Sequence, residues 1–119
     1  MKLGPGTEVN LLVQASDDCQ CSATGNCEFW AVRQKGTRLE LLLKTFMVQW
    51  FSVRNTRTNG YRDIQTSAHG SATFSELTLY KFNGKRYKAA QCWDRIYELQ
   101  EDGSNAQKPT ITAVPCGRR

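Results

Sequence analysis

Hydrophobic and polar residues alternate along this chain with a period of about two residues, which is typical of β-strands. The clearest run is 37–45, where Leu39, Leu41 and Leu43 are expected on one face of a strand. The run 47–53 alternates less regularly, as in a strand that is covered on both sides. The other face of 37–45 would largely carry Arg38, Glu40 and Lys44, and the pattern predicts strands over 7–15, 28–34, 37–45, 47–53, 63–68 and 73–82.

The strongest local signal is the pair Asn83-Gly84, which lies between two β-rich runs. A two-residue type I′ hairpin needs positive φ at both central positions, and Asn-Gly is the pair that adopts them most readily. Cross-strand neighbours then form aromatic contacts. The turn predicts that Phe82 lies opposite Lys85 and that Tyr80 lies opposite Tyr87.

The spacing of the strands predicts the fold class. Strands separated by roughly ten residues, with turn signals between them, form an antiparallel meander closed as a sandwich or barrel. A chain of 119 residues buries roughly two thirds of the surface that its unfolded form exposes, so it needs no metal merely to fold. We expect one compact all-β domain over 7–119, with a last strand at 110–114, and a flexible N-terminus over 1–6 that could partly be a cloning remnant.

The charge balance is basic. The chain has a formal net charge of +5 and a pI near 9.1. This balance suits an acidic partner such as nucleic acid, a lipid surface or an anionic polymer, and equally a surface that is simply basic. The cations are dispersed, and their longest cluster is KRYK at 85–88. The sequence has no segment apolar enough to cross a membrane, and its start, MKLGPG, has no apolar signal core.

Five cysteines are many for a chain of this size, and they indicate either a metal site or disulfide bonds. Cys19, Cys21 and Cys27 lack the paired C-x-x-C spacing of zinc ligands, and no histidine lies near them. A C-x-x-C redox motif is absent as well. We therefore expect disulfides, with no metal and no cofactor.

The cysteine pairing is predicted from the turns. The turn residues 24–26 could close a ring between Cys21 and Cys27, although Cys19 with Cys27 is a competing pair. A bridge between Cys92 and Cys116 would attach the C-terminus to the sheet and stabilise it by about 3 kcal/mol. The prediction is Cys21–Cys27 and Cys92–Cys116, with Cys19 free or intermolecular.

The stretch NTRTNGYRDI at 55–64 has the spacing of an acidic calcium loop, with asparagine at its first and fifth positions, a glycine and then Asp63. Calcium takes six or more oxygens, usually several of them from carboxylates. Here the third position is Arg57 and only Asp63 is acidic, so we predict no calcium binding. We expect a turn between two strands in which Arg57 or Arg62 pairs with Asp63 through charge-assisted hydrogen bonds.

The same stretch is also a candidate binding loop, together with the basic cluster at 85–88. Arginine and lysine would hold an anionic polymer, and an exposed ring such as Tyr61 could stack on a ligand. Most of the other rings are expected in the core. The candidate binding residues are Asn55, Arg57, Asn59, Tyr61, Arg62, Asp63, Lys85, Arg86 and Lys88.

His69 is the single histidine of the chain and the natural candidate for catalysis. With Ser71 two residues later and Asp63 six residues earlier, it could be drawn as a base between a nucleophile and an orienting acid. No G-x-S-x-G elbow marks Ser71 as activated, so a turn histidine is the better interpretation. The other carboxylates are scattered, and we assign no catalytic residue.

The motifs NGYRDI, HG and LTLYKFNGKRY between Asn55 and Lys85 resemble the FG-GAP type of β-propeller blade, whose calcium loop is followed by D-[LIV] and a glycine-rich turn. The blade's calcium-binding acids are missing here, and a propeller needs at least four blades, which this chain is too short to supply. The wider pattern, C-x5-C-x-F-W early and FNGKRY late, resembles small exported all-β proteins of bacteria without an assigned function. That resemblance implies a periplasmic or extracellular location and nothing about activity.

The leading hypothesis is a non-enzymatic, exported binding or envelope-associated protein with a signal peptide absent from this chain. Its partner would be an envelope glycan, an anionic polymer or a secreted protein, and nucleic acid is not the expected ligand. The first alternative is a small protein inhibitor of a secreted hydrolase that presents the loop 55–63. The second is a hydrolase that uses His69.

Overall fold

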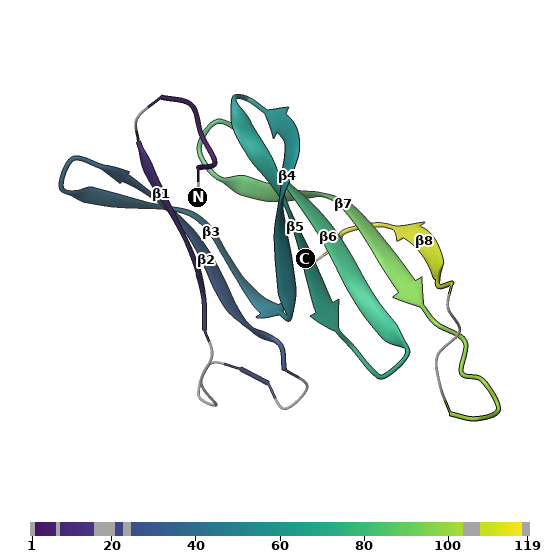
Figure 1. The fold of residues 1–119 in the computed structure, drawn as a ribbon. Helices are drawn as coiled ribbons and strands as arrows, with labels where there is room; N and C mark the ends of the chain where they lie inside the picture. The colour runs from purple at the N-terminus through teal and green to yellow at the C-terminus, as the bar shows by residue number, and fades with distance from the viewer. Residues whose placement is uncertain (1, 7, 16–20, 23–24, 104–107, 118–119) are drawn as a thin grey trace.

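The computed structural model describes residues 2–6, 8–15, 21–22, 25–103 and 108–117. Its strands form two antiparallel sheets, with β1, β2 and β3 in one and β4 to β8 in the other, and within each sheet the strands are paired in sequence order (Figure 1). The all-β meander is therefore confirmed. The described part of the chain contains no apolar helix of membrane-spanning length. The strands are β1 (Val9–Gln14), β2 (Cys27–Lys35), β3 (Arg38–Val48), β4 (Trp50–Thr58), β5 (Tyr61–His69), β6 (Phe74–Phe82), β7 (Tyr87–Ile96) and β8 (Thr110–Val114).

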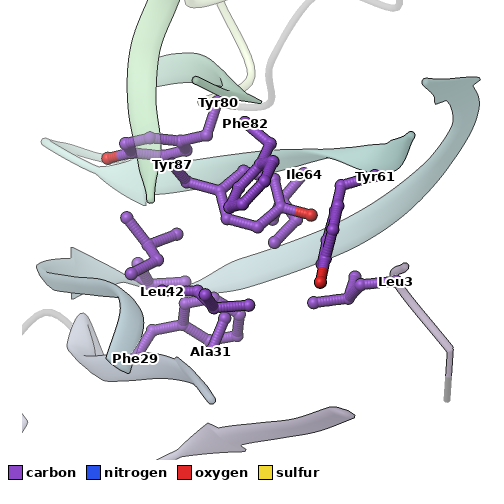
Figure 2. Packing of buried hydrophobic residues seen from close by; sticks show 11 residues of the cluster. Leu3, Phe29, Ala31, Leu42, Tyr61, Ile64, Tyr80, Phe82 and Tyr87 are labelled. Atoms are coloured by element: carbon purple, nitrogen blue, oxygen red, sulfur yellow. The ribbon is translucent and has the colours of Figure 1, made fainter. Parts of the chain in front are cut away.

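The two sheets pack against each other through one hydrophobic core (Figure 2). Phe29 and Ala31 of β2 are completely buried, as is Ile64 of β5. The rings of Phe29 and Phe51 connect the sheets, with their centroids 4.7 Å apart. The five-stranded sheet adds Tyr61, Tyr80, Phe82 and Tyr87 to the core.

A β-bulge in β3 decides which leucines are buried. Val32 pairs with Leu41 and Ala31 pairs with Leu43, so Leu42 is an extra residue on β3. An extra residue reverses the alternation of faces on the strand beyond it. Leu42 and Leu43 are therefore buried, whereas Leu39 is 63% exposed and Leu41 is 51% exposed. The prediction that Leu39, Leu41 and Leu43 share one face is wrong for this reason.

The stretch 55–62 is part of a β-hairpin and not an extended turn. Only Asn59 and Gly60 turn the chain, with φ of 52° and 85°, and Thr58 pairs directly with Tyr61. Positive φ at both central residues is what a type I′ turn requires. The strand expected over 47–53 also divides, because β3 continues to Val48 and β4 begins at Trp50.

The turn at Asn83-Gly84 is longer than predicted. Phe82 pairs with Tyr87, and the backbone N–H of Asn83 donates to the carbonyl of Arg86 at 2.9 Å. The side-chain oxygen of Asn83 accepts hydrogen bonds from the next backbone N–H groups, an arrangement that competes with the two-residue turn. The expected pairs Phe82 with Lys85 and Tyr80 with Tyr87 are therefore wrong, and Tyr80 pairs with Ala89.

The N-terminal residues are attached to the domain. Leu3 is completely buried in the core. Its carbonyl accepts a hydrogen bond of 2.9 Å from the backbone N–H of Arg62, and its N–H donates to the side chain of Asn10 at 2.8 Å. The flexible end expected over 1–6 does not describe residues 2–6, because Leu3 is a core residue.

Two disulfide bonds are present in the structure, and both are the predicted pairs. Cys21 is bonded to Cys27, six residues later. Cys92 of β7 is bonded to Cys116, 24 residues later, beyond the end of β8. Cys19, the predicted free thiol, lies outside the described residues.

Candidate functional site

Two hairpin tips lie side by side at one end of the five-stranded sheet (Figure 1). The side-chain amide of Asn59, at the β4–β5 tip, donates a hydrogen bond of 2.8 Å to the backbone carbonyl of Phe82, at the end of β6. The two sequence segments predicted to bind a partner are thus brought together. We call this region the basic end and define it by Arg54, Arg57, Arg62, Lys81, Lys85, Arg86 and Lys88.

The basic end carries the net charge of the whole chain. Segments 54–63 and 81–88 contain seven of the sixteen cationic residues and one of the eleven acidic residues. The remaining nine cations are matched by ten carboxylates. The positive charge is therefore concentrated in space, which the dispersed positions in the sequence do not indicate.

The arginines of the β4–β5 hairpin are held by backbone carbonyls and by an amide. Arg57 Nη1 donates to the carbonyl of Gly60 at 3.0 Å. Arg62 Nε donates to the carbonyl of Arg54 at 2.7 Å, and its Nη2 donates to Asn55 Oδ1 at 3.1 Å. None of these three bonds reaches Asp63, so the predicted pairing of Arg57 or Arg62 with Asp63 is wrong. These carbonyl and amide partners carry no formal negative charge. They therefore do not neutralise the guanidinium charges of Arg57 and Arg62.

Asp63 is turned away from the surface and is only 1% exposed. Its two carboxylate oxygens accept hydrogen bonds from the hydroxyl of Thr56 at 2.6 Å and of Thr58 at 2.8 Å. Buried carboxylates need such partners because desolvation is costly. Both oxygens, which a calcium ion would need as ligands, are therefore already hydrogen-bonded within the hairpin.

The β6–β7 tip presents its cations outward. Asn83 Oδ1 accepts hydrogen bonds from the backbone N–H of Lys85 at 2.9 Å and of Arg86 at 3.0 Å. The side chains of Lys85, Arg86 and Lys88 are exposed. The local hydrogen bonds thus fix the backbone from which these charged side chains extend.

The rings beside these cations belong to the core. Tyr61 and Tyr87 are buried, and Tyr61 stacks on Phe82 with centroids 4.1 Å apart. Tyr87 donates its hydroxyl proton to the carbonyl of Arg62 at 2.7 Å, and burial raises the pKa of its phenol. Tyr61, predicted as an exposed binding residue, is therefore not available for stacking on a ligand.

A charged network that the sequence did not reveal connects the two sheets around Tyr61. Arg33 Nη2 donates to Glu40 at 2.5 Å, and its Nη1 donates to the Tyr61 hydroxyl at 2.9 Å. The Tyr61 hydroxyl in turn donates to Glu8. The hydrogen bond from Arg33 lowers the pKa of Glu40. These hydrogen bonds connect β2, β3 and Glu8 to the β4–β5 hairpin. The buried Nε of Arg33 has no hydrogen-bond partner among the described residues and lies 4.0 Å from Glu8.

The structure keeps Asp63, one of the two proposed partners of His69, away from it. Asp63 lies six residues earlier on the same strand, which places it about 20 Å away. Ser71 Oγ lies 3.5 Å from Thr73 Oγ1. The backbone of His69 is fixed by two hydrogen bonds of 2.7 Å with the side chain of Asn26. A hydrolase, the second alternative, would need all three residues to converge, and the strand keeps Asp63 away from His69.

A shallow groove of about 240 Å³ lies between the end of β3 and the inner face of β5 and β6. Glu76 lines it, and Asp94 lies directly opposite Glu76 on β7. Nothing in the sequence placed two carboxylates side by side, whereas the pairing of β6 with β7 places Glu76 beside Asp94. In the described residues no third His, Cys, Asp or Glu joins them to make a metal site. The groove is otherwise lined by Thr45, Phe46, Met47, Thr66, Ala68, Thr78 and Tyr80.

Comparison of the chain with models of known protein families, with curated protein sequences and with solved structures finds no match. The resemblance of residues 55–85 to a propeller blade therefore stays a prediction from sequence, and function has to be argued from the geometry alone.

Proposed function

We propose that this chain is a non-enzymatic, exported binding protein whose basic end holds an anionic partner by charge. The observation that carries the proposal is the concentration of seven cations and a single buried carboxylate in two adjacent hairpins. Clustered charge of one sign attracts and orients a multiply charged ligand. Arg57 and Arg62 contribute positioned guanidinium groups because their side chains are hydrogen-bonded to the hairpin backbone.

The buried rings support a narrower ligand class. A neutral glycan or an unpaired base would be held mainly by stacking on exposed aromatic rings, and Tyr61, Phe82 and Tyr87 are buried. A polymer with repeated phosphate, sulfate or carboxylate groups needs only the cations. Two disulfide bonds support a location outside a reducing cytosol, in the periplasm or the extracellular space.

Calorimetric titration with polyphosphate tests the proposal. We expect the triple variant Lys85→Gln, Arg86→Gln, Lys88→Gln to bind polyphosphate about tenfold more weakly than the unaltered protein. The unaltered protein should also show the steeper dependence of affinity on salt concentration. The matched control is Lys35→Gln, Arg38→Gln, Lys44→Gln, which removes the same charge elsewhere and should have little effect. Equal losses in both variants would show that only the net charge matters and would overturn the site.

The β4–β5 tip favours a second candidate, an inhibitor of a secreted hydrolase. Asn59 and Gly60 are exposed, and the hairpin behind them is fixed by the bonds of Arg57 and Asp63. A tip already ordered in its bound shape loses little entropy on entering an active site. Assays of secreted glycosidases and proteases with the folded protein test this candidate. It fails if no enzyme is inhibited, or if deletion of the tip leaves the inhibition unchanged.

A further inference from the structure

A row of side chains crosses the outward side of the five-stranded sheet from β4 to β7. Trp50 pairs with Ser67, Ser67 pairs with Leu77, and Leu77 pairs with Trp93. Successive residues of a strand point to opposite faces, and Phe51, next to Trp50, contacts a ring of the three-stranded sheet. The row therefore points away from the core. Its first member, Trp50, is 54% exposed.

The same side of the sheet continues from this row to the basic end. In the next outward row, Gln65 pairs with Leu79, and Leu79 pairs with Gln91. Lys81 then pairs with Lys88, and both point outward because the residues on either side of each lie in or against the core. The three rows cover about 13 Å along β6. We call this surface the tryptophan face and define it by Trp50, Gln65, Lys81, Lys88, Gln91 and Trp93.

The tryptophan face is positive because the carboxylates of its five strands are turned away from it. These strands contain three carboxylates. Asp63 is buried and bonded to threonine hydroxyls, whereas Glu76 lines the groove on the inner side and Asp94 pairs with Glu76. Lys81 and Lys88 lie directly opposite each other, and like charges in that position repel. An anion between them would relieve this repulsion, so the face is complementary to an anionic partner.

The exposed ring and the amides indicate which kind of anionic polymer fits. A sugar ring has a face of C–H groups that packs on an indole, and its hydroxyl groups can exchange hydrogen bonds with amides such as those of Gln65 and Gln91. Polyphosphate would use the cations and leave Trp50 without a role. A single-stranded nucleic acid stacks successive bases on several rings, whereas the rings beside the cations of the basic end are buried.

We propose that the tryptophan face binds an acidic polysaccharide, a sugar chain with repeated sulfate or carboxylate groups. Its acidic groups lie at Lys81, Lys88 and the rest of the basic end, and one of its sugar rings stacks on Trp50. Trp50 is two strands and four positions away from Lys81, about 16 Å, so only an extended polymer reaches both. The inference rests on the proposed function, because it names the class of polymer that the basic end binds.

Isothermal titration with dextran sulfate, polygalacturonate and polyphosphate tests the inference. We expect Trp50→Ala to bind the charged polysaccharides about tenfold more weakly than the unaltered protein and to bind polyphosphate equally well. Trp50→Phe keeps a ring and should retain most of the affinity. The matched control is Phe46→Ala, because Phe46 is a similarly exposed ring, at 58%, on the other sheet. Denaturant unfolding should show that all variants are folded. The polysaccharide that binds more tightly identifies sulfate or carboxylate as the recognised group.

The other outcomes separate the inference from the proposed function. Equal binding of the charged polysaccharides by Trp50→Ala and Phe46→Ala would overturn the inference, and so would an equal loss of polyphosphate binding in Trp50→Ala. If polyphosphate binds and neither polysaccharide does, the inference fails alone, and the variant Lys85→Gln, Arg86→Gln, Lys88→Gln still decides the proposed function. Oligothymidylate that binds more tightly than both polysaccharides, through Trp50, would assign the face to single-stranded nucleic acid. Uncharged dextran binding as tightly as dextran sulfate would overturn both proposals.

Discussion

The side chain of Asn59 connects two hairpins that are more than twenty residues apart in sequence, by donating a hydrogen bond of 2.8 Å to the carbonyl of Phe82. Asn59 also holds a positive φ of 52° in its turn. The substitution Asn59→Gly keeps the turn and removes the bond, so we expect a loss of about 1 kcal/mol in the free energy of unfolding. Asn59→Ala also places an alanine in the left-handed region and should lose about 1–2 kcal/mol more.

Denaturant unfolding of the two Asn59 variants measures both effects. Polyphosphate titration of Asn59→Gly tests whether the bond also positions the two groups of cations. If it does, this variant binds polyphosphate more weakly although its net charge is unchanged. Equal stability of Asn59→Gly and Asn59→Ala would contradict the contribution of the backbone conformation.

The hydroxyl groups of Thr56 and Thr58 are the partners of the buried Asp63 carboxylate. Replacing both threonines by valine leaves that carboxylate without them, and we expect a loss of about 2–4 kcal/mol in the free energy of unfolding. Thr112→Val on the exposed strand β8 is the control and should change stability by less than about 0.5 kcal/mol. In an Asp63→Asn background the same double substitution should cost less, because no charge is left buried; an unchanged cost would contradict the assigned role.

Calcium should not bind to the β4–β5 hairpin. Asp63 is its one carboxylate, it is buried, and its oxygens accept from threonine hydroxyls. Arg57 places a cation next to the turn, where Nη1 donates to the Gly60 carbonyl. Isothermal titration with calcium chloride should give no binding heat. A site of micromolar affinity would show that the hairpin opens and that its resemblance to a calcium loop is functional.

The two disulfides should differ in their contribution to stability. In the chain-entropy model, a bridge across 24 residues, as in Cys92–Cys116, contributes about 3–4 kcal/mol, and one across six residues, as in Cys21–Cys27, contributes about 2 kcal/mol. Replacing each pair by serine and measuring unfolding tests this order, and the reverse order would contradict it. Thiol counting on the denatured, unreduced protein should find one free thiol, that of Cys19; three would mean that one bridge is absent.

Stability should fall in alkaline solution because of Tyr87. Burial raises the pKa of this phenol above its ordinary value of about 10, so above that pH the unfolded chain loses a proton that the folded chain keeps. The contribution is complete below pH 10 and is lost as the pH rises further. The pKa of Tyr61 is raised in the same direction, also mainly by burial.

Urea unfolding at stepwise pH, followed together with phenolate absorbance, measures this effect. Tyr87→Phe should flatten the alkaline decline and lower stability at neutral pH by about 1 kcal/mol, because the hydrogen bond to the Arg62 carbonyl is lost. An unchanged alkaline decline in Tyr87→Phe would assign the effect to other groups.

The placement of Thr56 opposite Asp63 could have been predicted from the sequence. A type I′ turn at Asn59-Gly60 implies that Thr58 lies opposite Tyr61 and that Thr56 lies opposite Asp63, two positions farther along each strand. The same dipeptide occurs at Asn83-Gly84, and only the first one makes the two-residue turn. At the second turn the side chain of Asn83 bonds to the following backbone N–H groups instead. The dipeptide is the same at both turns, so sequence alone does not show which one will form the two-residue turn.

The sequence alone could not predict which leucines of β3 are buried. Period-two alternation assumes an uninterrupted strand, and the bulge at Leu42 interrupts β3, which pairs with β2 and also contacts the five-stranded sheet. The exposure of Leu39 and Leu41, in contrast to the burial of Leu43, follows from that bulge.

The sequence by itself determined the all-β class and the approximate strands and favoured the two cysteine pairs, because strand periodicity and turn residues act over short distances along the chain. The tertiary structure decided which faces are buried and which charges lie together. It joined Asn59 to Phe82 and Arg33 to Tyr61, and it turned Asp63 inward. These contacts depend on strand register and on the packing of one sheet against the other, and neither is encoded in any single segment.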